Sequence, residues 1–197
     1  MPVLHMARKY EFKPDKPQTT LADRLFLTKK QRRELLKWSL YGLLLLLLSV
    51  TQDVLLSRAR LYGATTELVP VGIFVICLLE GLETGSVFAL VASCIYQFSG
   101  TPGGTYSIVF ITGICVLVTM LRQAYLQKGF GSAFLLTALA MLLYELLVLG
   151  IGVFLGLTHI SRITGFLLTA GLSLTVIPAV YPAALFIGKI GGEVWKE

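Results

Sequence analysis

One acidic residue lies in the middle of a long apolar run. Glu145 occurs in the sequence Ala140-Met-Leu-Leu-Tyr-Glu145-Leu-Leu. Because ionisable groups are expensive inside lipid and usually face the protein interior, each is a candidate for function. Glu145 could contact a basic or hydroxyl group of a partner, or take part in proton-linked chemistry. It could also accept a hydrogen bond from a Thr, Gln or Tyr of its own bundle, and the sequence leaves both interpretations open.

Two further polar residues are predicted to lie inside or at the edge of the membrane. Asp53 follows Thr51 and Gln52 at the end of an apolar stretch, about one helical turn before Arg58 and Arg60. This spacing favours an ion pair at the membrane interface. Tyr96 lies near the end of another apolar stretch, and we count it with Asp53 and Glu145 as an intramembrane polar residue.

The remaining acidic residues mark predicted helix ends. Glu67 precedes Pro70, as expected for an acid that interacts with the dipole at a helix start. Glu80 and Glu83 lie on either side of a short turn. These two carboxylates could dock the basic N-terminal segment, although two solvated turn residues would explain the spacing equally well.

The residues that usually carry catalysis or hold metals form no recognisable pattern. The two histidines, His5 and His159, lie far apart, which argues against a metal site. Ser161 is close to His159, but the sequence offers no acid to complete a triad and no Gly-x-Ser-x-Gly motif. The three cysteines match no zinc or redox spacing. We therefore expect a protein that is not an enzyme and that carries no metal and no cofactor.

The composition predicts that most of the chain lies in a membrane. Of 197 residues, 55% are hydrophobic and only 14% are charged, whereas soluble domains are about 25% charged. This excludes a soluble enzyme, a secreted disulfide scaffold and a nucleic-acid-binding domain. We predict an all-α polytopic membrane protein with six transmembrane helices in a compact bundle. The predicted spans are about 38–56, 66–80, 84–99, 105–125, 130–156 and 163–187.

The positive charge of the chain is concentrated at its N-terminus. Residues 1–37 hold ten lysines and arginines but four acidic residues, which accounts for the net charge of +6. Basic residues beside a first span mark the cytoplasmic side and attract anionic lipids. We predict a cytoplasmic tail over 1–37, a transmembrane domain over 38–190 and a cytoplasmic C-terminal tail over 191–197. The end of the first tail fits either a short amphipathic helix or a solvated basic linker, and the sequence leaves both interpretations open. Nucleic acid is not expected as a partner.

Small residues and prolines predict contacts and bends. Gly152 and Gly156 have the four-residue spacing found where helices pack closely. Pro178 and Pro182 lie on one face of the last span and should bend it. A glycine-rich outer turn would let another chain approach closely. With two outer arginines, it forms the predicted partner contacts: Arg58, Arg60, Ser99, Gly100, Pro102, Gly103 and Gly104.

Four short motifs follow one another along the chain: Thr51-Gln52-Asp53, Glu67-Leu-Val-Pro70, Glu80-Gly81-Leu-Glu-Thr-Gly85 and Ser99-Gly-Thr-Pro-Gly-Gly104. Over residues 38–187, this order resembles the bacterial rod-shape-determining protein MreD family. Members of that family commonly carry an aspartate where this chain has Tyr96. The family also carries an acidic residue directly beside the proline that opens the second span, whereas in this chain the acid is Glu67, three residues before Pro70.

The resemblance implies a non-catalytic component of the machinery that elongates the bacterial cell wall. Such proteins lie in the cytoplasmic membrane with both termini in the cytoplasm. They bind the scaffold MreC and are associated with the MreB filament, a SEDS glycosyltransferase and a class B penicillin-binding protein. The alternative is a substrate-binding subunit of a vitamin-type uptake transporter. Its pocket would be lined by Gln52, Asp53, Tyr96, Gln97 and Glu145.

Overall fold

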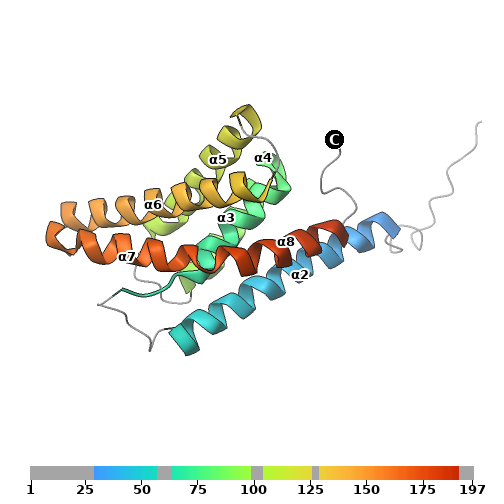
Figure 1. Cartoon of the computed structure of the whole chain (residues 1–197). Coiled ribbons are helices and arrows are strands. Elements are labelled where there is room, and N and C mark those ends of the chain that lie inside the picture. Colours follow the sequence, from blue (N-terminus) through green and yellow to red (C-terminus); the bar gives the residue numbers. More distant parts are fainter. Residues whose placement is uncertain (1–28, 57–63, 99–103, 126–128, 191–197) are drawn as a thin grey trace, which may run out of the picture.

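The computed structural model describes residues 29–56, 64–98, 104–125 and 129–190. Within these ranges the chain folds into helices joined by short turns (Figure 1). The helices are α2 (Lys29–Thr51), the π-helical turn η1 (Gln52–Leu56), α3 (Leu68–Glu80), α4 (Leu82–Phe98), α5 (Tyr106–Tyr125), α6 (Phe130–Phe154), the 3₁₀ turn η2 (Ile160–Arg162), α7 (Ile163–Leu174) and α8 (Ile177–Ile190). The all-α prediction is therefore confirmed.

Three helices are long and apolar enough to cross a membrane. They cover Gln31–Val54, Tyr106–Ala124 and Phe130–Phe154, and α7 with α8 would make a fourth span if the bent pair counts as one. The helices α3 and α4 are apolar but shorter, at 13 and 17 residues. At 1.5 Å per residue they measure about 20 and 26 Å, which is less than the usual hydrocarbon thickness.

The short helix α3 is the centre of the fold. All of its residues from Leu68 to Leu79 are buried, as expected for a helix that is hydrophobic on every face. It contacts α2, α4, α5, α6, α7 and α8. Figure 1 shows α2 beside α8 and α6 beside α7 around it. The outer faces of α2 and α4 remain apolar and exposed, which suits contact with lipid or with another helix.

The last predicted span is broken into two helices. The axes of α7 and α8 differ by 48° across Thr175 and Val176. A proline ring clashes with the carbonyl four residues earlier, and Leu174, four residues before Pro178, is where α7 ends. Pro182 lies inside α8 without interrupting it. Of the two prolines, Pro178 therefore accounts for the bend.

The N-terminal segment and the first span are continuous where they are described. Residues 29–37, the end of the predicted tail, belong to the same helix α2 as residues 38–51. The rest of the predicted tail and amphipathic helix (residues 1–28) and the C-terminal tail (191–197) lie outside the described residues. The boundary expected at residue 38 is thus not a break in the helix.

Helices α3 and α4 approach each other closely at Gly85. A Cβ atom on this residue would lie 2.8 Å from the Cys77 carbonyl oxygen, which is fixed backbone. We predict that Gly85→Ala lowers the free energy of unfolding by about 1–3 kcal/mol, because the helices must separate. The matched control is Gly113→Ala in α5, where nothing lies within 4 Å of the new atom. Thermal unfolding in detergent would measure both, and equal effects would contradict the prediction.

Candidate functional site

A groove of about 900 Å³ runs between α2 and α4 and is open on one side. Both helices pack on α3, and they contact each other at one end, where Trp38 of α2 meets Phe88 of α4. The walls are almost entirely apolar, with large side chains on both sides: Leu45 and Leu46 from α2, and Val87, Phe88, Val91 and Ile95 from α4. Val87 and Ile95 are 65% and 64% exposed. The groove could therefore receive an apolar helix or chain from the membrane.

The two ends of the groove carry its polar side chains. Trp38, Glu83 and Thr84 lie at one end, beside the turn between α3 and α4. The Trp38 ring packs against Phe88, with ring centroids 5.6 Å apart. At the other end lies Tyr96. By the predicted orientation, the first end is the cytoplasmic one, so an occupant would meet an acidic residue there.

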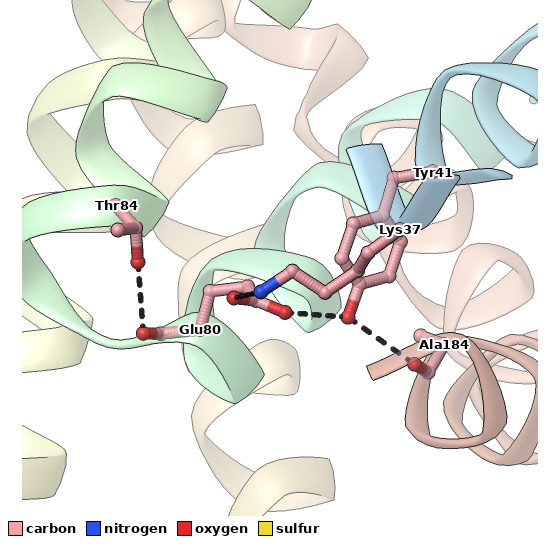
Figure 2. Close-up of polar contacts among 5 residues, drawn as sticks. All are labelled: Lys37, Tyr41, Glu80, Thr84 and Ala184. Atoms are coloured by element: carbon pink, nitrogen blue, oxygen red, sulfur yellow. Dashed lines mark hydrogen bonds and ion pairs between the residues drawn. The ribbon is translucent and has the colours of Figure 1, made fainter. Parts of the chain in front are cut away.

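A buried ion pair fixes α2 at the end of the groove that holds Trp38 (Figure 2). Lys37 Nζ lies 2.6 Å from Glu80 Oε2, and the two side chains are only 10% and 6% exposed. The Tyr41 hydroxyl donates to Glu80 Oε1 at 2.7 Å and lies 3.3 Å from the Ala184 carbonyl oxygen of α8. The Thr84 hydroxyl donates to the backbone carbonyl of Glu80. These contacts join α2, α3, α4 and α8, and so hold one wall of the groove in place.

The ion pair decides between the two interpretations of the turn carboxylates. Glu80 pairs with Lys37, the last residue of the basic segment, so Glu80 is not a solvated turn residue, whereas residues 1–28 of that segment lie outside the described residues. Glu83 is exposed and lines the groove.

Gln52 connects three helices at the opposite end. Its Oε1 accepts hydrogen bonds from the backbone N–H groups of Leu68 and Val69 at 2.8 and 3.1 Å. Its Nε2 donates to the Tyr96 hydroxyl at 3.1 Å. A helix start leaves such N–H groups without partners, so Gln52 acts as the cap of α3. Glu67 lies at the start of α3, as predicted, but its side chain makes no cap hydrogen bond.

Two acidic residues, Glu67 and Glu145, each have a buried carboxyl oxygen and act electrostatically on Tyr96. Glu67 lies just before α3, and Glu145 lies in α6 and is 3% exposed. The two carboxyl groups interact electrostatically with each other and with Tyr96 and Tyr144. One oxygen of each, Glu67 Oε2 and Glu145 Oε1, is buried without a hydrogen-bond partner. We call Glu67, Tyr96, Tyr144 and Glu145 the carboxyl cluster.

The structure brings together some of the predicted polar residues and separates others. Tyr96 and Glu145 belong to the carboxyl cluster, and Gln52 donates a hydrogen bond to Tyr96. Asp53 is exposed and accepts a hydrogen bond from Ser49, and Gln97 accepts one from Ser107. These two residues therefore belong to other local networks.

The predicted partner contacts lie mostly outside the described residues. This applies to Arg58, Arg60, Ser99, Gly100, Pro102 and Gly103. Gly104 is described and has a φ of +63°, a left-handed conformation that favours glycine. Its carbonyl accepts a hydrogen bond from the Ser107 N–H at the start of α5.

The glycine pair near the end of α6 shapes the helix end. Gly156 has a φ of +69°, and the Leu157 and Thr158 N–H groups bond back to the Gly152 carbonyl. This is how a glycine commonly terminates a helix. A Cβ on Gly152 would meet the Thr158 side chain at 2.8 Å. The spacing predicted helix packing, whereas the described contacts of these glycines lie within their own turn.

In the described ranges, no three His, Cys, Asp or Glu side chains gather as a metal-ion site would require. Comparisons with protein-family models, curated proteins and solved structures give no match for this chain.

Proposed function

We propose that the chain is a non-catalytic integral component of the bacterial cell-wall elongation machinery, and that it binds an MreC-type scaffold. The order of motifs over residues 38–187 supports this assignment, and the open groove between α2 and α4 supports a binding role. Through the scaffold, the protein would help to organise the peptidoglycan synthases. An MreB-type filament, a SEDS glycosyltransferase and a class B penicillin-binding protein are further proposed partners.

The groove is the observation that carries the proposal. Its apolar walls, exposed on α2 and α4, suit the anchor helix of a single-span protein. Such an anchor typically has Lys or Arg at its cytoplasmic end, where Glu83 would face it. The groove lining includes this carboxylate but none of the basic residues of α2, so an anionic lipid headgroup inside the groove would be repelled. A basic anchor helix therefore suits the groove better than an anionic lipid.

We further propose six crossings of the bacterial cytoplasmic membrane, with both termini in the cytoplasm. In this arrangement α3 and α4 are two short crossings, and α7 with α8 forms one bent crossing. The long helices that surround α3 would meet the lipid. The distribution of basic residues along the chain favours this orientation.

A substrate-binding transporter subunit is the second candidate. The observation in its favour is that Gln52, Tyr96 and Glu145, three of the five predicted pocket residues, gather in one place. This candidate predicts that the purified chain associates with an ATPase module and retains a small metabolite.

Site-specific photo-crosslinking tests the first proposal. A photo-reactive residue at Val91, in the middle of the α4 wall, should crosslink to the anchor helix of an MreC-type scaffold in intact cells. The same probe at Val109, an exposed position on α5 outside the groove, should give at most about a tenth of that product. Equal products at both positions would contradict docking in the groove. Recovery of an ATPase module in place of the scaffold would favour the transporter.

A further inference from the structure

The carboxyl cluster contains two acidic oxygens that nothing in the described structure satisfies. Glu145 Oε1 and Glu67 Oε2 are both fully buried and have no hydrogen-bond partner. Buried polar atoms in proteins nearly always have a partner, and each exception needs a physical reason. Here the two exceptions come from different elements, α6 and the segment before α3. Their carboxyl groups lie within electrostatic range of each other.

The surroundings of this cluster supply oxygen atoms and irregular backbone. Tyr96 and Tyr144 place hydroxyl groups in the field of both carboxyl groups. Ser173 accepts a hydrogen bond from the Glu67 N–H at 2.9 Å. Three departures from α-helix occur at or beside residues that belong to the cluster or bond to it: the π-helical turn that begins at Gln52, the extended Glu67 and the break two residues after Ser173. Such interruptions in membrane proteins often surround bound ions.

The charges within the cluster have the same sign. Among the described residues, the groups that act electrostatically on Glu145 and on Tyr144 are carboxyl groups. Were both carboxyl groups ionised, their like charges in a low-dielectric interior would repel each other strongly and would lack the solvation that water gives. A positively charged ligand would remove both penalties and would satisfy the two orphaned oxygens.

We propose that Glu67 and Glu145 bind a small hard cation, of the alkali or alkaline-earth class, between α3 and α6. Carboxylate and hydroxyl oxygens are the ligands that such cations prefer, and soft transition metals would require nitrogen or sulfur. Tyr96 and Tyr144 are the candidate neutral ligands. Because Tyr96 also lines the groove and bonds to Gln52, the bound ion would brace α3, α4 and α6 against one another.

A thermal-unfolding experiment on the purified full-length chain in detergent tests the proposal. Choline chloride is replaced by NaCl, KCl, CaCl₂ or MgCl₂ at constant ionic strength. At least one of these cations should raise the Tm saturably, by about 5–10 °C at a hundredfold excess over its Kd. Glu145→Gln and Glu67→Gln should each abolish that rise. Glu83→Gln, an exposed acid elsewhere in the chain, should retain it.

A direct binding measurement gives a second readout. The wild-type chain and Glu83→Gln should retain the radioactive form of the same cation, ²²Na⁺ or ⁴⁵Ca²⁺ for example, whereas Glu145→Gln should lose it. If Glu145→Gln does not fold, Glu67→Gln and Tyr144→Phe take its place, because both leave the Glu145 side chain unchanged. Each should retain less of the cation than the wild-type chain.

Three outcomes would overturn the proposal. The first is a Tm that no cation raises above its value in choline. The second is a cation-induced rise that persists in both glutamine variants. The third is a Tm that is insensitive to cations but falls when Arg58 and Arg60 are both changed to Gln, which would assign the neutralising charge to the chain itself. A Tm that changes with pH but not with any cation is a case of the first outcome. It would indicate that Glu67 and Glu145 share a proton in place of a cation.

Discussion

Lys37→Met should lower the free energy of unfolding by about 3–5 kcal/mol, the cost of leaving one partner of a buried ion pair alone. The Lys37 and Glu80 side chains are 10% and 6% exposed, and their charged atoms lie 2.6 Å apart. Without the ammonium group, the Tyr41 hydroxyl is the one side-chain partner that the described residues leave to the Glu80 carboxylate. Unfolding in detergent by heat or by denaturant would measure the loss.

A double variant separates the cost of an unpaired charge from the loss of packing. Lys37→Met combined with Glu80→Gln removes both charges and keeps an acceptor for Tyr41, so it should recover more than half of the lost stability. Arg33→Met is the matched control, because Arg33 lies one turn earlier on α2 and is exposed. It should change stability by less than about 0.5 kcal/mol. A Lys37→Met effect as small as that of Arg33→Met would show that the pair behaves like a surface salt bridge.

The helices themselves could be predicted from the sequence because apolar length is a strong signal. Each predicted span coincides with a helix or with the α7–α8 pair, to within a few residues except at the start of α2. The number of helices that cross a membrane cannot be predicted from apolar length in the same way. Helix α3 is as apolar as a spanning helix, but it is short and is surrounded by six other helices. Hydropathy alone does not distinguish burial in lipid from burial in protein.

The contacts between helices were harder to predict than the helices. Lys37 and Tyr41 are four residues apart, so they lie on one helix face, and this spacing was the available signal for a shared partner. Their partner Glu80 is 39 residues beyond Tyr41, and only the packing of α2 on α3 brings them together. Gln52 caps α3 from a different helix, whereas sequence rules for caps look only a few residues before the helix start.

Val91→Trp should reduce the amount of MreC-type scaffold that co-purifies with the chain by about thirtyfold or more, corresponding to the loss of a central contact worth at least 2 kcal/mol. Val91 lies in the middle of the α4 wall of the groove and is 51% exposed. A tryptophan there would occupy the space that an anchor helix needs, without entering the core around α3. Quantitative mass spectrometry of the tagged chain, gently extracted from its own cells, would measure the ratio of scaffold to chain.

The control for this variant is Val109→Trp, because Val109 is 69% exposed on α5 and does not line the groove. Both variants present a tryptophan to the membrane, so they should be equally stable and equally abundant. If both lose the scaffold, the effect arises from a changed lipid-facing surface. If neither loses it, the partner binds elsewhere, and the outer turn and Arg58 and Arg60 become the next positions to change. Loss in Val91→Trp alone would place the anchor helix between α2 and α4, beside the wall that Lys37 and Glu80 hold in position.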